Sequence, residues 1–341
     1  MPSRSSIESL SSVLTETSTT SLSSSGCEFM RVFLIQTARG LFSSSGGYKA
    51  NICLLRYLAS RGHSVRQLCY FHHNEVEDYV QKMATESGHE VRVHKKILHL
   101  SSGCERSGAD VEVVQLTMKD GVEIVALHKE AFDAAFGGKD NLHKEISRET
   151  AEYIEKGILS ARLSDFVSFL QNEIIAYLPT HVVSNDGLSM QATSVSELPG
   201  LDISRVVVLH TAEQLPFGPF AGGMPGMNSS PKELTLLRQL DGIGSVSVAI
   251  KDYATKYGQL RTDFFVHHPW TYLKEDTHQM PCQMHNWDKK FVGMTNPCAV
   301  KGSKILLDLA AACPHLDFLI YKSWGMDEKL EQRLSSLKNM M

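Results

Sequence analysis

The chain has 341 residues, of which 42% are hydrophobic and 21% are charged, and its formal net charge is -4. This composition is typical of a globular protein long enough for two domains. The small negative charge argues against binding to nucleic acid or to an anionic membrane surface, since both favour a basic protein.

The first 29 residues are rich in serine and threonine and lack the apolar region of a secretory signal. We expect 1–29 to form a disordered tail. The sequence contains no run of about 18 apolar residues, so we expect no transmembrane segment. Seven cysteines, odd in number and without a C-x-x-C pair, indicate reduced thiols, and we therefore expect a cytoplasmic protein.

Strand and helix patterns alternate from residue 30 onward. "RVFLIQT" is a short apolar run, typical of a buried parallel strand, and an amphipathic helix follows it and ends at Gly62. The predicted elements are strands at 31–37, 64–70 and 89–98, and helices at 48–61 and 75–87. This alternation predicts an α/β fold with a Rossmann-like parallel sheet.

The next stretch, near 108–178, is expected to be an insertion. Its two β-rich runs at 111–128 surround the turn signal Lys119-Asp120-Gly121, which predicts a hairpin, and helical segments follow from 130 to 177. The strand pattern then returns. We predict strands at 180–186 and 204–211 and helices at 231–241 and 246–258, which complete an N-terminal domain over 30–262.

Residues 263–289 are rich in His, Pro, Trp and Met and are predicted to link two domains. The pattern of the first domain then begins again over 290–341, with strands at 291–295 and 317–321 and helices at 302–313 and 327–338. Because a doubly wound domain needs about 100 residues, we expect 290–341 to be an incomplete second Rossmann-like domain.

The loop before the first helix carries the pair Gly46-Gly47. A helix N-terminus presents backbone N–H groups and the positive end of the helix dipole, and glycine lets a ligand approach closely. The spacing fits neither G-x-G-x-x-G nor the P-loop pattern, which argues against a nicotinamide-dependent oxidoreductase. The loop is either a tight turn without a ligand or a site for a nucleotide, a sugar or an acceptor.

Two further stretches follow apolar strands. In "NPCAVKG", Asn296 and Gly302 flank a turn in which Lys301 can direct a cation at a diphosphate near a helix N-terminus; a solvated lysine is the alternative. In "LHTAEQLPFGPF", His210 lies at the carboxyl end of a strand, where open α/β sheets bind ligands.

His210 is a candidate for contact with a sugar or for acid–base chemistry, with Glu213 as a possible partner, although a histidine packed in the loop fits the pattern equally well. Asp186 ends a strand in the same way and is a weaker candidate for substrate contact. The sequence contains no D-x-D, H-E-x-x-H or G-x-S-x-G motif. The histidine pairs His72-His73 and His267-His268 are adjacent, so their side chains diverge, and we expect no metal site.

Several of these segments together resemble GT-B glycosyltransferases of the glycosyltransferase 4-like group. They are "RVFLIQTARGLFSSSGGYKANICLLRYLASRGHSV", "HTAEQLPFGPF", "VSVAIKDYATKYG" and "FVGMTNPCAVKGSKILLDLA", and the resemblance covers about 30–341. It implies an acceptor domain followed by a nucleotide-sugar donor domain. It also implies that Gly46 and Gly47 line the donor phosphates or sugar, that His210 contacts the sugar, and that Lys301 neutralises the leaving diphosphate without a metal. The nucleotide-sugar is then a co-substrate, and no cofactor is expected.

One part of the family's pattern is missing. Such enzymes usually carry an E-x7-E segment in the donor domain, whereas this sequence offers only Glu328 and Glu331 after residue 323. The alternatives are therefore a shortened glycosyltransferase, half of a split enzyme, or a noncatalytic GT-B-like partner protein that forms an oligomer or binds a C-terminal partner.

Overall fold

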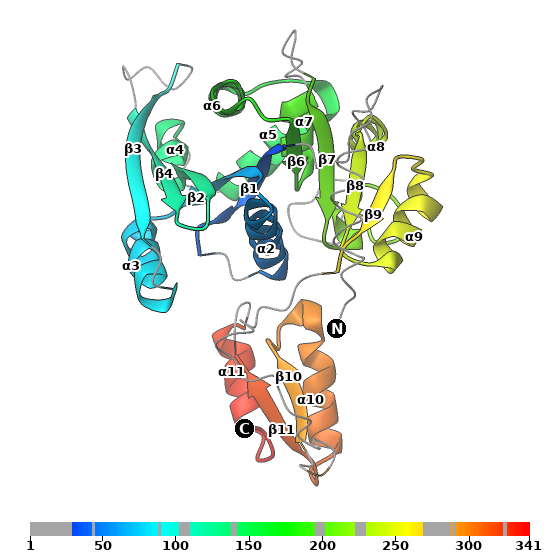
Figure 1. The fold of residues 1–341 in the computed structure, drawn as a ribbon. Coiled ribbons are helices and arrows are strands. Elements are labelled where there is room, and N and C mark those ends of the chain that lie inside the picture. The colour runs from blue at the N-terminus through cyan, green and yellow to red at the C-terminus, as the bar shows by residue number, and fades with distance from the viewer. Residues whose placement is uncertain are drawn as a thin grey trace. The chain divides into compact units, whose positions relative to one another are not determined.

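We describe the protein from a computed structural model (Figure 1). The structure describes residues 29–42, 45–87, 90–101, 110–137, 142–194, 202–221, 230–268, 288, 291–322 and 326–341. The chain divides into two compact units, Met1–Thr271 and Tyr272–Met341. Nearly all of the predicted tail and most of the predicted linker lie outside the described residues.

The larger unit contains a sheet of nine strands in the order β3-β4-β5-β2-β1-β6-β7-β8-β9. Neighbouring strands from β5 to β9 are parallel, whereas β3, β4 and β5 pair antiparallel. The strands are β1 (Arg31–Gly40), β2 (Ser64–Phe71), β3 (Val91–His99), β4 (Asp110–Met118), β5 (Val122–His128), β6 (His181–Ser184), β7 (Ser204–Leu209), β8 (Gly242–Ser245) and β9 (Phe264–Val266). The predicted α/β fold with a mostly parallel sheet is confirmed.

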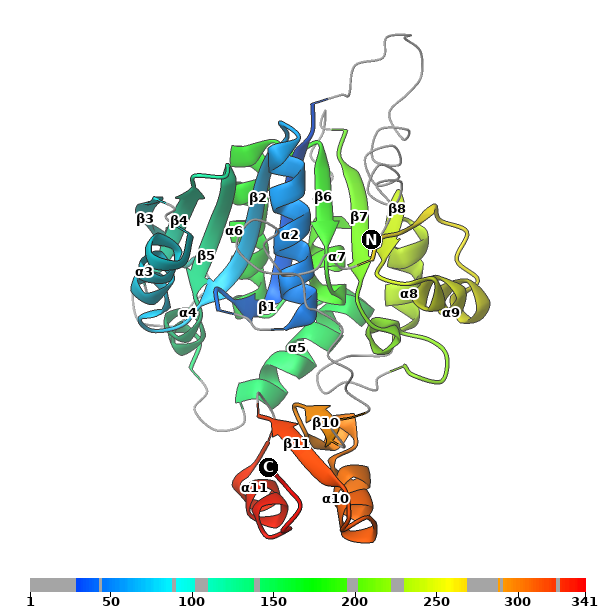
Figure 2. The ribbon, with the colours of Figure 1, turned by 60° about the horizontal axis from the view of Figure 1, so that its bottom comes forward.

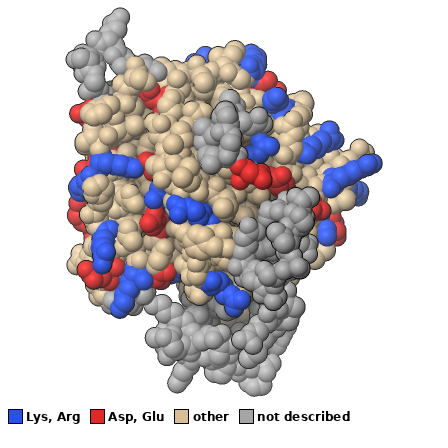
Figure 3. Space-filling view, turned by 45° about the horizontal axis from the view of Figure 1, so that its top comes forward, with Lys and Arg blue, Asp and Glu red and all other residues tan. Residues whose placement is uncertain are grey.

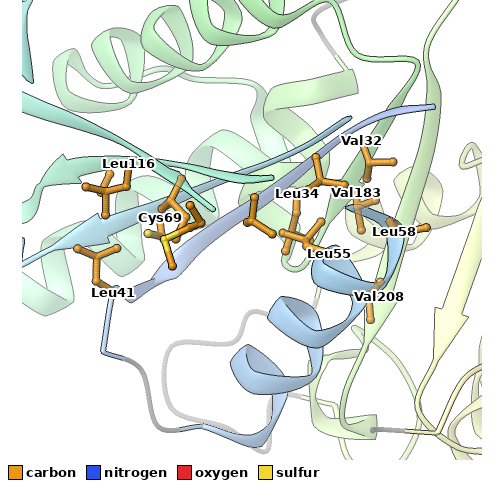
Figure 4. Packing of buried hydrophobic residues seen from close by; sticks show 14 of the residues in the cluster. Val32, Leu34, Leu41, Leu55, Leu58, Cys69, Leu116, Val183 and Val208 are labelled. Carbon is orange, nitrogen blue, oxygen red and sulfur yellow. The ribbon is translucent and has the colours of Figure 1, made fainter. Parts of the chain in front are cut away.

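Helices cover both faces of this sheet, with α2 in front of the central strands in Figure 2. Alternation along β1 explains the arrangement: Val32 and Leu34 pack with Leu55 of α2 (Figure 4), whereas Phe33 and Ile35 belong to a second core with α6 and its neighbours. The helices are α2 (Gly46–Ser60), α3 (Glu75–Ser87), α4 (Lys129–Ala135), α5 (Leu142–Lys156), α6 (Ala161–Tyr177), α7 (Gly187–Ser194), α8 (Pro231–Arg238) and α9 (Val248–Gly258).

The hairpin predicted at 111–128 forms as β4 and β5, and both strands belong to the main sheet. The apolar strand β5 lies between β4 and β2 and pairs with β2 in parallel. The strand predicted at 89–98 forms, but it is not parallel to its neighbour in the sheet. As β3 it pairs antiparallel with β4 at the edge of the sheet, and its side chains are mostly exposed.

Three short elements were not predicted. The strand β8 reads "GIGS", β9 reads "FFV", and α7 reads "GLSMQATS". Segments of three to eight residues are too short to display a clear strand or helix period. β9 lies inside the stretch predicted as a linker, and its pairing with β8 extends the sheet as far as Val266.

The smaller unit follows the predicted order of strand, helix, strand and helix. Its parallel strands β10 (Phe291–Thr295) and β11 (Asp317–Tyr321) are followed in turn by α10 (Ser303–Ala312) and α11 (Glu328–Ser335). The buried residues of its core are Leu306, Leu307, Ala310, Phe318 and Leu334.

Charged side chains of both signs are interspersed on the face of the molecule drawn in Figure 3. The described residues of that face therefore offer no continuous basic surface to nucleic acid. Within the described residues, no helix is both long and apolar enough to cross a bilayer. Four of the seven cysteines are described, at positions 53, 69, 298 and 313, and all four are free thiols.

Candidate functional site

The candidate site lies at the carboxyl ends of β1, β6 and β7, near the N-terminus of α2. The chain leaves β1 toward β2 on one side, while β6 lies on the other side, so the strand order reverses here. Open α/β sheets bind ligands at such points. The loop sequence explains the start of α2: Ser45 is the N-cap, its Oγ accepts from the backbone N–H of Tyr48, and Gly46 and Gly47 form the first turn.

Gly47 and His210 pack directly against each other. His210 immediately follows β7, and a Cβ placed on Gly47 would lie 3.0 Å from Cγ and 3.1 Å from Cδ2 of the imidazole. A real Cβ contact is rarely this close, so the glycine allows the ring to lie on the first turn of α2. The structure thus brings together two of the residues singled out in the sequence.

The His210 ring is held by a hydrogen bond to Asn51, one turn further along α2. Its Nε2 lies 3.0 Å from the Oδ1 of Asn51, whose Nδ2 donates to Gln36 Oε1 at 2.9 Å and to Asn185 Oδ1 at 3.3 Å. Because Asn51 Oδ1 can only accept, Nε2 of His210 carries the proton. The lone pair of the ring is therefore on Nδ1.

Gln214 fixes the backbone on either side of this ring. Its Oε1 accepts from the N–H groups of His210 and Thr211 at 2.7 and 3.1 Å, and its Nε2 donates to Asn185 O at 3.1 Å. Gln214 ends the short 3₁₀ helix η1 (Ala212–Gln214), in which the predicted partner Glu213 also lies. The partner of the His210 ring in the structure is Asn51, and the role of Glu213 stays a prediction.

The pKa of His210 is lowered to about 4. Burial is the larger cause, and the nearby His267 is the smaller one. His267 itself is buried, and burial followed by His268 lowers its pKa to about 4 as well. Both rings are therefore neutral at physiological pH. A neutral His210 accepts a hydrogen bond at Nδ1, but it is a weak base.

Asp186 lies between β6 and α7 and links both to β1. Its Oδ2 accepts from the hydroxyl of Thr37 at 2.5 Å and from the Thr37 N–H at 3.3 Å, and its Oδ1 accepts from Ser189 N at 2.8 Å. Both carboxylate oxygens thus have donors within the protein. This arrangement caps α7 and fixes the carboxyl edge of β1.

Sequence reasoning missed Glu233, a buried carboxyl group close to this edge. It packs against Gly187, the first residue of α7, so closely that a Cβ placed on this glycine would collide with Oε1 of Glu233. Burial, and then Asp186 and Glu155, raise the pKa of Glu233 to about 8. The motif "SPKE" at 230–233 predicts the helix start that the structure contains, with Ser230 Oγ accepting from Glu233 N, but it does not reveal where the carboxyl group goes.

The remaining predicted residues lie together in the smaller unit, at the carboxyl end of β10. Lys301 is exposed in the 3₁₀ turn η3 (Ala299–Lys301), and Gly302, with φ of +86°, precedes α10. Asn296 is buried, and neither polar atom of its side chain has a hydrogen-bond partner among the described residues. These residues surround the N-terminus of α10, as the sequence predicts.

One group within the described residues has donors suited to a metal ion: His73, His128 and Glu130. It lies at the carboxyl ends of β2 and β5, apart from the set around His210.

Neither a protein-family model nor a curated protein matches the sequence. Solved structures do match in fold. TarM is 10% identical, with a TM-score of 0.52, over 92% of this chain and 76% of that protein. A sucrose-phosphate synthase from Thermosynechococcus elongatus is 11% identical, with a TM-score of 0.53, over 92% of this chain and 69% of that protein.

A point mutant of S. aureus TarM, in complex with Fondaparinux, alpha-GlcNAc-glycerol and UDP, is 10% identical, with a TM-score of 0.51, over 92% of this chain and 77% of that one. These proteins have the fold of GT-B glycosyltransferases, and this chain shares it.

Proposed function

We propose that this protein is a glycosyltransferase of the glycosyltransferase 4-like group that transfers a sugar from a nucleotide-sugar donor to an acceptor hydroxyl without a metal in the reaction. The observation that carries the proposal is the neutral His210, which lies on Gly47 and bonds to Asn51 at the switch point of a GT-B-like sheet. TarM has been solved with UDP and alpha-GlcNAc-glycerol, which are ligands of the kind we assign to this chain.

In this proposal His210 positions a hydroxyl group. With its proton on Nε2 and bonded to Asn51, the ring offers Nδ1 as an acceptor for a sugar or acceptor hydroxyl. The first turn of α2 supplies the positive end of a helix dipole beside it, which favours a phosphate or a polar sugar group. Because the pKa of His210 is about 4, its role is orientation rather than removal of a proton at neutral pH.

Lys301 stabilises the leaving group. When the bond between the anomeric carbon and the diphosphate oxygen breaks, negative charge develops on the nucleoside diphosphate, while the acceptor oxygen bonds to that carbon and loses its proton to solvent water. A lysine at a helix N-terminus supplies the positive charge that a metal supplies in other enzymes. The exposed Lys301, beside Gly302 and Asn296 at the start of α10, fits this role.

The test is release of nucleoside diphosphate by the purified 341-residue chain from a panel of nucleotide-sugars in chelator-treated buffer. We expect turnover of at least one donor, and Lys301→Ala is expected to reduce it at least about 10-fold because a charge-assisted contact is lost. Lys304→Ala, which removes an exposed lysine from the same helix start, is the matched control. Absence of both turnover and donor binding across the panel would contradict the proposal.

A second candidate is a noncatalytic GT-B-like protein that binds a partner through the smaller unit. It is favoured by exposed apolar side chains there, including Ile305 and Leu309 on α10 and Phe291 on β10, which are 64%, 47% and 45% exposed. Light scattering during size-exclusion chromatography separates the two candidates. A monomer that turns over a nucleotide-sugar would exclude the second one.

A further inference from the structure

Three side chains with metal-binding atoms meet at the carboxyl ends of β2 and β5. The two strands are paired in parallel, with Phe71 opposite His128, so they end at the same edge of the sheet. His73 comes two residues after Phe71, His128 is the last residue of β5, and Glu130 lies in the first turn of α4. Strand pairing thus assembles residues that are 55 positions apart in the sequence.

The distances within this group suit a single small cation. Nε2 of His128 lies 3.2 Å from Nδ1 of His73 and 3.6 Å from Oε2 of Glu130, and all three atoms lie within 4.8 Å of one another. Ligand atoms bonded to one tetrahedral zinc ion at 2.0–2.1 Å are about 3.3 Å apart. Two of the three separations are therefore close to those of a ligated ion.

The orientation of the ligands is already fixed by neighbouring side chains. The Phe71 ring stacks on the His128 ring at a centroid distance of 4.8 Å and an interplanar angle of 12°. His72 Nδ1 bonds to Oε1 of Glu130, which leaves Oε2 facing His128. In many metal sites a carboxylate that does not touch the metal hydrogen-bonds to a ligand and so fixes its orientation. Here His72 fixes the orientation of the Glu130 carboxylate in the same way.

The Oε2 atom of Glu130 gives an independent indication of a missing partner. It is buried, and it accepts no hydrogen bond from the described residues. A buried carboxylate oxygen that accepts no hydrogen bond costs free energy, and a bound cation removes that cost.

We propose that His73, His128 and Glu130 bind a divalent transition-metal ion of the zinc class, with the fourth coordination position open to solvent beside the exposed His73. Two imidazoles and one carboxylate suit Zn²⁺ and Co²⁺, whereas Mg²⁺ and Ca²⁺ prefer oxygen ligands only. The site is separate from the His210 set, so it does not depend on the proposed transfer reaction.

The adjacent pair His72-His73 led the sequence argument away from a metal. In the structure, however, His73 contacts His128 and His72 contacts Glu130, so both histidines contribute to one site. His72 also packs on the end of β1, since a Cβ on Gly40 would lie 3.2 Å from its Cδ2. A bound ion would therefore cross-link β2, β5 and α4 and stabilise the edge near β1.

The test uses the untagged 341-residue chain, freed of metal with a chelator, because a histidine tag would bind the probe. Titration with Co²⁺ is expected to give a visible absorption band that saturates at one ion per chain and disappears when excess Zn²⁺ is added. His73→Ala and Glu130→Gln are each expected to weaken binding by about 10-fold or more.

His99→Ala is the matched control, because His99 and Asp110 form an exposed histidine–carboxylate pair, 2.7 Å apart, without a third ligand among the described residues. It is expected to bind Co²⁺ as the wild type does. Thermal melting of each metal-free variant shows whether the variant still folds. The proposal is overturned if Co²⁺ gives no saturable band, or if His73→Ala and Glu130→Gln bind as tightly as the wild type and His99→Ala.

Discussion

Asn51 Oδ1 lies 3.0 Å from Nε2 of His210, although the two residues are 159 positions apart in the chain. The same amide group donates to Gln36 and Asn185, so one buried side chain joins β1, α2 and the ends of β6 and β7. This relationship determines the tautomer of His210 and the position of its ring.

We expect Asn51→Ala to destabilise the protein by about 1–3 kcal/mol, because it removes a hydrogen-bond partner from the buried Gln36 and from the half-buried Asn185. The free energy of unfolding in urea is the measurement. Lys49→Ala, at an exposed position two residues earlier on α2, is the control and should change stability little. Equal stability of the Asn51 and Lys49 variants would show that the network contributes nothing.

Replacement of Gly47 by alanine is expected to move the His210 ring rather than to unfold the protein. The new Cβ would lie 3.0 Å from Cγ of the ring, so the imidazole must shift by a few tenths of an ångström. We predict a loss of donor turnover of about 10-fold or more with a melting temperature near that of the wild type. Gly293→Ala, which places a Cβ in open space, is the control. Wild-type kinetics in Gly47→Ala would contradict the assigned position of the ring.

The half-buried His210 and the buried His267 predict a loss of stability in mild acid. Their folded-state pKa values, about 4, lie below the ordinary value near 6.5, so the unfolded chain binds protons first as the pH falls. Their contribution is fully present above pH 6.5 and is lost between about pH 6.5 and 4. His210→Gln should flatten this fall in urea midpoints, whereas the exposed His99→Gln should not. An unchanged slope in His210→Gln would refute the prediction.

Glu233 predicts the opposite trend at alkaline pH. Its folded-state pKa of about 8 lies above the ordinary value of 4.5, so its contribution to stability is present at low pH and is lost as the pH rises toward 8. Glu233→Gln should therefore be more stable than the wild type at about pH 9. The control is Glu77→Gln, which changes an exposed glutamate at the corresponding third position of α3. It should not be more stable than the wild type at about pH 9. Denaturation midpoints at about pH 6 and 9 test both variants.

The sequence predicted the long elements well, because apolar runs such as "RVFLIQT" and the glycine that follows the first helix are local signals. It did not predict that β5 joins β2, since strand order depends on pairing between distant segments. The same limit applies to the candidate site. Gly47 and His210 were singled out from their positions at strand and helix ends, whereas Asn51 looks in the sequence like any other residue of an amphipathic helix.

Glu233 and the group around His128 were missed for the same reason. Each is recognised as a candidate site only from its contacts with residues of other elements. Glu233 contacts Gly187, and His128 contacts His73. A motif at fixed spacing cannot encode such contacts, and only the folded chain brings them together.

In the proposed sugar transfer, His210 orients a reacting hydroxyl group. The most direct measurement is kcat/KM for the best nucleotide-sugar donor, compared among the wild type, His210→Ala and the exposed control His99→Ala. We predict a fall of about 10-fold or more in His210→Ala, with unchanged folding by circular dichroism and no fall in His99→Ala. A His210→Ala variant that retains the kcat/KM of the wild type would contradict the account.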